Sequence, residues 1–282
     1  MRNAVDPDPS LSEGELAVYR RDGLVRPGWR LPDPDVADLR ALLGETLAST
    51  RGRRPESLVC PHVAGMNDLP ATITDRWLAL ASRPEFLDIV ERVIGPDIIL
   101  WGSQLFCKPA GTGLAVPWHQ DGHFWPIRPL ATCTLWLALD DVDAENSAML
   151  FVPGSQRTRD LYPHADQPSE ESALNAELLP EHVDLDRVEV DALPAGAFSL
   201  HDVFLIHGSE PNRSDRRRAG YVIRYMPATS HYDRDLAREG SSHAPTNLGD
   251  RPLYLLRGED WTGKTGLVDL RPQASAATAA PS

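Results

Sequence analysis

Cysteine is scarce in this 282-residue chain, and long apolar runs are missing. Cys60, Cys107 and Cys133 are too few and too scattered for a disulfide framework or a cysteine zinc site. The longest apolar run, residues 93–101, is interrupted by glycine, proline and aspartate, and no stretch approaches the roughly 20 apolar residues of a membrane helix. Residues 1–10 lack the apolar core of a secretory signal. We therefore expect a cytoplasmic protein with reduced cysteines and no membrane partner.

Positive charge is also in short supply. The formal net charge is −13, from 28 basic and 41 acidic residues, and the only basic cluster is the short segment 213–218. A protein that binds nucleic acid needs a basic patch to displace the counterions of the phosphates. We therefore expect no nucleic-acid partner.

The chain divides into a core and two polar ends. Residues 1–10 are rich in proline and residues 272–282 are of low complexity, so we expect disordered tails there. Residues 11–271 are expected to form a single domain. Its predicted parts are a helical front (11–95), a barrel (98–226), and C-terminal loops with a closing segment (227–271).

Apolar spacing predicts helices in the front and strands behind them. The predicted helices are Leu11–Arg21, Pro34–Ser49 with Asp33 as N-cap, Ile73–Leu80 and Pro84–Val93. The predicted strands are Ile98–Lys108, Cys133–Leu139, Ala148–Val152, Val188–Asp191, Ala197–Leu200, Val203–His207 and Ala219–Tyr225. This order favours a sandwich or barrel with helices packed on its outside. Residues 156–187 and 227–252 are expected to form long loops, which compact domains seldom keep without a function.

The triplet His-x-Asp occurs four times, so its presence alone carries no weight. The copies that begin at His164, His182 and His231 lie in polar runs, and we interpret them as surface residues. Only the pair His119 and Asp121 is flanked by tryptophan, phenylalanine and proline. A buried imidazole and carboxylate need a partner or a metal, so this copy is the candidate site.

A mononuclear Fe(II) site for oxygen chemistry needs two imidazoles and one carboxylate on one face of the metal. His119 and Asp121, two apart on a segment expected to be extended, would point to the same side. The candidate for the second imidazole is His207, which closes an apolar strand 88 positions after His119. An arginine that enters the following strand could reach a carboxylate bound at the metal.

On these residues the sequence resembles the phytanoyl-CoA dioxygenase family of Fe(II)- and 2-oxoglutarate-dependent oxygenases. The resemblance rests on four blocks, whose order and spacing make it specific. They are Tyr19–Val25, His119–Pro129, Leu150–Ser155 and His207–Ser214, the last followed by Arg218. Together they span roughly residues 17–226.

The resemblance implies a mainly β protein with flanking helices, folded as a double-stranded β-helix of the jelly-roll or cupin-like kind. It implies that three residues bind the iron and form the catalytic centre: His119, Asp121 and His207. It implies that four residues bind the cosubstrate 2-oxoglutarate: Arg218, Ser209, Gln104 and Trp136. The guanidinium of Arg218 suits the far carboxylate because its fork can donate two parallel hydrogen bonds.

Two positions depart from the family pattern. Ser147 stands where the family often has glycine, and Ala197 stands where an acidic residue is common. His123 and His201 occur in family-like contexts, and we interpret them as residues that surround the metal ligands or pack near them, with contact to the substrate as the alternative for His123. The substrate-facing mouth is expected to come from residues 62–67, 124–128 and the loop after Met226.

The reaction implied by the resemblance is hydroxylation of a small molecule, with O2 consumed and succinate and CO2 released. The carboxylate of Asp121 disfavours halogenation, because related iron halogenases have a small residue there. Desaturation, cyclisation and epoxidation by the same iron site remain open, as do a zinc hydrolase and a non-catalytic cupin-like binding module. The sequence leaves open whether the substrate is a CoA ester, a free acid, an amino acid or a natural-product intermediate. It also leaves the oligomeric state unknown.

Overall fold

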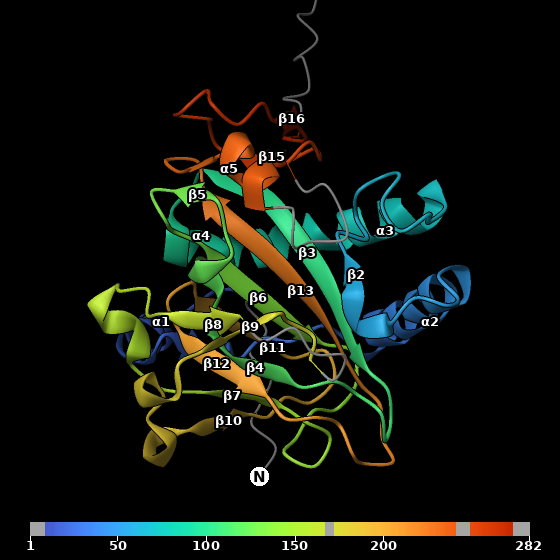
Figure 1. The fold of residues 1–282 in the computed structure, drawn as a ribbon. Helices are drawn as coiled ribbons and strands as arrows, with labels where there is room; N and C mark the ends of the chain where they lie inside the picture. Colours follow the sequence, from blue (N-terminus) through green and yellow to red (C-terminus); the bar gives the residue numbers. More distant parts are fainter. Residues whose placement is uncertain (1–8, 167–171, 241–248, 273–282) are drawn as a thin grey trace, which may run out of the picture.

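Two β-sheets of unequal size surround one cavity in the computed structural model, which describes residues 9–166, 172–240 and 249–272 (Figure 1). The predicted tails, 1–10 and 272–282, lie almost wholly outside these residues. The large sheet has the strand order β1-β11-β6-β13-β3-β15-β16, with β2 paired to β3. Its strands are β1 (Leu24–Val25), β2 (Leu58–Val59), β3 (Ile98–Lys108), β6 (Cys133–Ala138), β11 (Phe198–Asp202), β13 (Arg218–Pro227), β15 (Tyr254–Arg257) and β16 (Val268–Asp269).

The small sheet has the order β10-β7-β12-β4, and every pair in it is antiparallel. Its strands are β4 (Val116–Gln120), β7 (Met149–Phe151), β10 (Glu189–Asp191) and β12 (Ile206–Ser209). Two further antiparallel pairs join β5 (Ile127–Arg128) to β14 (His231–Tyr232) and β8 (His164–Asp166) to β9 (Ala176–Leu178). The predicted β-helix with flanking helices is therefore confirmed.

The α-helices lie outside the barrel, and four of them belong to the predicted helical front (Figure 1). They are α1 (Glu13–Asp22), α2 (Asp33–Ser49), α3 (Ala71–Ala81), α4 (Pro84–Ile94) and α5 (Arg234–Gly240). Shorter 3-10 helices cover Pro55–Ser57, Asp121–His123, Ser155–Thr158, Pro180–His182 and Leu185–Arg187. Helix α1 begins with a capping box between Ser12 and Glu15. The expected N-cap of α2 is wrong, because Asp33 is its first residue and Pro32 caps it without a side-chain hydrogen bond.

The structure differs from the sequence-based expectations in three further places. The strand expected at Val203–His207 begins at Ile206, because Asp202 accepts hydrogen bonds from the backbone of Phe204 and Leu205 and closes a turn. Strand β4 was not expected, because Pro117 within it obscures the strand signal. The segments expected to be long loops also contain the short strands β8, β9 and β14 and the helix α5.

The alternation of side chains along β13 separates the core from the cavity. Tyr221 and Tyr225 belong to the apolar core shared with the helices, and both are fully buried. Arg218, Val222 and Arg224 point to the opposite face and line the cavity. This alternation is the period of two expected for a strand with different surroundings on its two faces.

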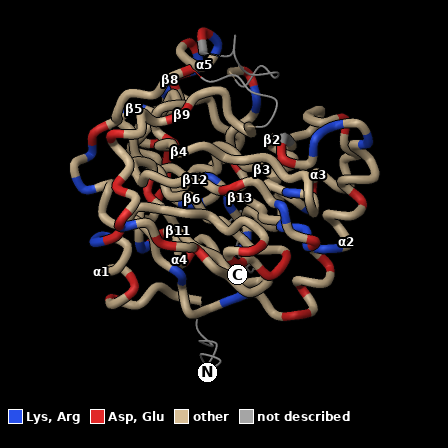
Figure 2. Tube along the Cα trace, turned by 60° about the horizontal axis from the view of Figure 1, so that its bottom comes forward, with Lys and Arg blue, Asp and Glu red and all other residues tan. Residues whose placement is uncertain are grey.

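Basic and acidic residues are interspersed along the described elements, as Figure 2 shows. None of the helices in the described part of the chain has the length and apolar character needed to cross a bilayer.

Gly220 allows Trp136 to lie flat against β13. A Cβ atom at position 220 would lie 2.3 Å from the ring of Trp136, far inside van der Waals contact. We expect Gly220→Ala to lower the free energy of unfolding by about 1–3 kcal/mol, because overpacking forces the indole out of its place. Urea denaturation measures this loss. The control is Gly44→Ala, where a Cβ would meet nothing within 4 Å; an equal loss in both variants would contradict the prediction.

Candidate metal and anion site

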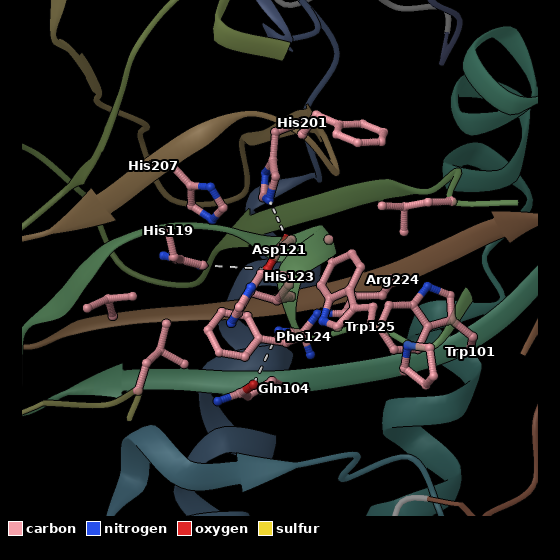
Figure 3. A pocket seen from close by; sticks show the side chains of 18 of the residues that line it. Trp101, Gln104, His119, Asp121, His123, Phe124, Trp125, His201, His207 and Arg224 are labelled. Carbon is pink, nitrogen blue, oxygen red and sulfur yellow. Dashed lines mark hydrogen bonds and ion pairs between the residues drawn. The ribbon is translucent and has the colours of Figure 1, made fainter. Parts of the chain in front are cut away.

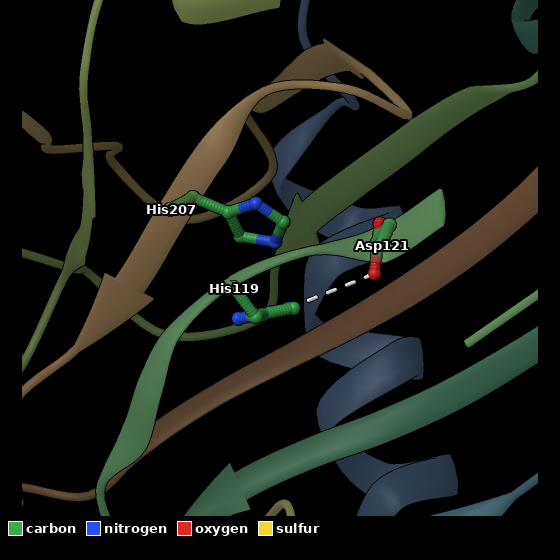
Figure 4. A group of neighbouring side chains, drawn as sticks. All are labelled: His119, Asp121 and His207. Atoms are coloured by element: carbon green, nitrogen blue, oxygen red, sulfur yellow. Dashed lines mark ion pairs between the residues drawn. The ribbon is translucent and has the colours of Figure 1, made fainter. Parts of the chain in front are cut away.

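The pairing of β4 with β12 places two histidines directly opposite each other. His119 and His207 are partners in the strand register, and their ring centroids are 4.1 Å apart. Asp121 follows β4 immediately, and ligand atoms of the three residues all lie within 4.8 Å of one another (Figure 4). All three side chains are buried. The extended conformation expected for both residues is wrong at Asp121, which opens a 3-10 turn instead of continuing the strand.

Backbone carbonyl groups fix the orientation of both imidazoles. Nδ1 of His119 lies 2.8 Å from the carbonyl oxygen of Pro117, and Nδ1 of His207 lies 2.9 Å from that of Leu205. Since a carbonyl only accepts, each Nδ1 carries the proton and each Nε2 keeps its lone pair. Burial, and then the neighbouring His119, lower the pKa of His207 well below its ordinary value. Neutral imidazole is the form that binds a metal.

The Asp121 carboxylate has two imidazole neighbours. Nε2 of His119 lies 3.7 Å from Oδ1, and Nε2 of His201 lies 3.4 Å from Oδ2. Burial alone would raise the pKa of Asp121, but the contacts with His119 and His201 hold it well below the ordinary value. His201 stands on β11 beside His207, with the two ring centroids 4.9 Å apart, and points toward Asp121 (Figure 3). It therefore positions the carboxylate.

The donor set fits a metal of the predicted kind. Two imidazole nitrogens and one carboxylate oxygen, here within 4.8 Å of one another, are the ligands of non-haem Fe(II) oxygenases. The cavity beside them measures about 880 Å³, which leaves room for further ligands and a small molecule. These donors also suit Zn²⁺, so the triad alone does not identify the metal.

Arg218 is a buried cation that forms no ion pair with any of the described residues. Its exposed fraction is 2%, and its Nε forms no hydrogen bond in the described part of the chain. The guanidinium carbon lies 4.8 Å from the ring centre of Trp136. Burial lowers the pKa of Arg218 to about 10. A buried charge without a partner is costly, so this guanidinium is suited to an anionic ligand.

Lys108 is buried behind Ser209 at this end of the cavity, and no sequence pattern indicated its position. Its Nζ donates to Ser209 Oγ at 2.7 Å, to Ser147 Oγ at 2.9 Å and to the carbonyl of Glu210 at 2.6 Å. Burial and then the charge of Arg218 lower its pKa to about 6. Ser147, the departure from the family pattern, has a φ of 74°, which explains the usual glycine there.

Gln104 lies farther along β3 and faces the same cavity. It donates from Nε2 to the carbonyl oxygen of Glu56 at 3.1 Å and accepts from Arg224 at 3.2 Å (Figure 3). The four residues expected to bind the cosubstrate thus all line the cavity that contains the metal triad. They are Gln104, Trp136, Ser209 and Arg218.

The remaining His-x-Asp copies contribute no residue to the metal cluster among the described residues. The expected surface position of His164 is wrong, because its ring is half-buried, stacks on His123 at 3.9 Å and accepts from the backbone of Gln120. His182 stacks on Tyr162 at the periphery. The His-x-Asp triplet alone therefore does not identify the metal ligands, whereas the apolar residues around His119 and Asp121 do.

The mouth of the cavity agrees with two of three expected segments. Phe124, Arg128 and Tyr232 line it, from residues 124–128 and from the loop after Met226. The segment 62–67 does not contribute, because His62 is buried against Ser103 at 2.6 Å.

Residues 19–220 match the family described as Phytanoyl-CoA dioxygenase (PhyH). The "Probable alpha-ketoglutarate-dependent hypophosphite dioxygenase" of Stutzerimonas stutzeri is 32% identical over 152 residues, which are 53% of this chain and 52% of that protein. The peroxisomal phytanoyl-CoA dioxygenase of Homo sapiens is 31% identical over 159 residues, 53% of this chain and 45% of that protein. The chain thus spans about half the length of these two curated relatives.

A longer match is the L-proline trans-4-hydroxylase of Streptomyces griseoviridis, 28% identical over 233 residues, 75% of this chain and 85% of that protein. Among solved structures, the apo non-heme monooxygenase ThoJ superposes with a TM-score of 0.64 at 24% identity, covering 90% of this chain and 86% of that chain. EctD from S. alaskensis gives a TM-score of 0.63 at 18% identity, covering 82% and 80%. These two structures support the β-helix fold.

We expect the protein to bind one divalent ion, measured with Co²⁺ by calorimetry. His207→Ala should weaken that binding at least about 100-fold, because it removes one of three ligands from a rigid site. The control is His182→Ala, which removes an imidazole that stacks on Tyr162 outside the triad. Equal affinities of the two variants would contradict the assignment of the site.

Proposed function

The chain belongs to the phytanoyl-CoA dioxygenase family, and from this membership we propose that it is an Fe(II)- and 2-oxoglutarate-dependent dioxygenase that hydroxylates a small molecule. The observation that carries the proposal is the buried guanidinium of Arg218, which lacks a carboxylate partner among the described residues and lines the same cavity as the metal triad. The hydrolysis reaction of a zinc hydrolase would assign no role to such an arginine. A dianionic cosubstrate that chelates the metal would bind the arginine through its second carboxylate.

We assign the iron to His119, Asp121 and His207. Their Nδ1–carbonyl contacts and the His201 contact fix the three side chains, which all line the cavity, so an ion held by them would be accessible from the cavity. Such fixed geometry keeps coordination positions open for cosubstrate and O2. With iron and 2-oxoglutarate bound, oxidative decarboxylation supplies the oxidising chemistry, yielding succinate and CO2 while one oxygen atom enters the substrate.

We assign the far carboxylate of 2-oxoglutarate to Arg218 and Ser209. Lys108 holds the Ser209 oxygen as an acceptor at 2.7 Å, which leaves the hydroxyl proton available to a carboxylate. Trp136 supports the guanidinium from one side and excludes water there. Gln104 lines the cavity between this end and the aromatic residues at the mouth. Residues 11–271 are proposed to form the single domain that carries these parts.

The substrate class remains a small molecule, because the cavity of about 880 Å³ is closed around its metal end by buried side chains. The curated relatives are named for dissimilar substrates: proline, hypophosphite and phytanoyl-CoA. Family membership therefore supports the iron chemistry more strongly than any one substrate.

Anaerobic titration with Fe(II) and 2-oxoglutarate tests the cosubstrate. We expect a visible charge-transfer band that is lost in His207→Ala. In Arg218→Ala the 2-oxoglutarate concentration that gives half of the full band should rise about 100-fold, since a buried charge-assisted contact is removed. Arg217→Ala is the matched control, because the neighbouring Arg217 pairs with Asp140 at 2.8 Å and does not line the cavity. A wild-type protein without the band would refute the proposal.

Turnover provides a separate measurement. A substrate found by screening should gain one oxygen atom for each succinate released, as measured by mass spectrometry. Asp121→Ala should abolish both products, because the ion loses its only anionic ligand. Succinate release coupled to a product without added oxygen would instead indicate desaturation, cyclisation or another two-electron oxidation.

A further inference from the structure

A second arginine lines the cavity on the same face of β13. Arg218 and Arg224 are six residues apart, so they stand about 20 Å from each other along the strand. The first serves the end of the cavity near Ser209. Figure 3 shows the second extending from β13 toward Gln104, with the Trp125 and Trp101 rings beside it. The proposed function assigns Arg224 no role.

Arg224 has no anionic partner in the described part of the chain. Its one hydrogen bond goes to the neutral amide oxygen of Gln104 at 3.2 Å, and its buried Nε has no partner. Asp121 attracts it electrostatically, but no ion pair within 4 Å forms between them. By contrast, Arg159 at the same cavity is paired with Asp202 at 2.8 Å.

Loading of the site removes the attraction from Asp121. A divalent ion outweighs the charge of that carboxylate, and the two negative charges of 2-oxoglutarate then offset the remaining charge of the ion and that of Arg218. Arg224 is left as an uncompensated positive charge beside the reaction centre. In surroundings of low polarity such a charge favours an anion strongly.

The walls around Arg224 are aromatic. The rings of Trp101 and Trp125 meet edge to face at 4.5 Å, and the guanidinium carbon of Arg224 lies 5.3 Å from the Trp125 ring centre and 5.9 Å from that of Trp101. Phe124 also lines this part of the cavity. A ligand held here meets one fixed cation and large apolar surfaces.

We propose that Arg224 binds a carboxylate of the substrate, so that the substrate is a small carboxylic acid with an apolar body. This inference rests on the proposed function, because the offset of charge requires metal and 2-oxoglutarate. The anion at Arg224 and the apolar body against the exposed faces of the aromatic wall would hold the substrate beside Asp121. Arg224 is thus a residue that determines specificity.

Calorimetry on the anaerobic Fe(II)–2-oxoglutarate complex tests the proposal. The probes are benzoate, phenylacetate, 3-phenylpropanoate and 4-phenylbutanoate, each compared with its primary amide, because the amide keeps the shape and loses the charge. We expect at least one carboxylate to bind about tenfold or more tighter than its amide, the size of a charge-assisted hydrogen bond. Arg224→Gln should abolish that preference, and Arg224→Lys should retain part of it.

Arg217→Gln is the control, since it removes a positive charge that points away from the cavity and pairs with Asp140. It should keep the preference for carboxylates. If no carboxylate binds more tightly than its amide, or if Arg224→Gln keeps the preference, the proposal is overturned. The charge-transfer band distinguishes failure of this inference from failure of the proposed function. A band that persists in Arg224→Gln with the carboxylate preference lost supports the inference, whereas a wild type without any band refutes the proposed function itself.

Discussion

The register between β4 and β12 is the constraint on which the site depends. It sets His119 opposite His207 and thereby brings together two imidazoles that are 88 positions apart in the sequence. A shift of one residue in this pairing would turn one ring to the other face of the small sheet. The carbonyls of Pro117 and Leu205, each two residues before its histidine, then orient the rings through Nδ1. Strand pairing and ring orientation are thus set by the same backbone.

Much of this arrangement could be predicted from the sequence. The features that could not be predicted have one physical cause in common, which is their dependence on residues far away in the chain. The strand Ile98–Lys108 was predicted with its observed bounds, because a long β-branched and aromatic run is a local signal. The pair His119 and Asp121 was recognised from its apolar neighbours. In contrast, Lys108 has no local signature, since its role comes from Ser209, which lies far away in the chain. His201 was expected near the site, but its contact with Asp121 depends on strand pairing that its neighbours in the sequence do not show.

The two faces of β13 show how one strand serves both stability and ligand binding. Tyr225 donates to the carbonyl of Ala81 at 2.8 Å within the apolar core, while Arg218 and Arg224 project into the cavity. Burying two guanidinium groups without carboxylates costs stability, which the apolar face of the same strand offsets. The chain therefore retains charges that the fold does not need. Such groups mark positions where ligands complete the electrostatics.

The end of the cavity near Arg218 contains two buried basic side chains that a ligand would complete. Lys108 and Arg218 face each other across the β3–β13 pair, and the pKa of each is lowered by burial. The pKa of Lys108, lowered to about 6 by burial and then by the charge of Arg218, shows that the site without an anion disfavours the ammonium form. A carboxylate placed beside them would raise that pKa and return the proton to Nζ. Only the ammonium form can donate to Ser209, Ser147 and the carbonyl of Glu210 at once, so a carboxylate that restores this form also completes contacts whose acceptors are already in place.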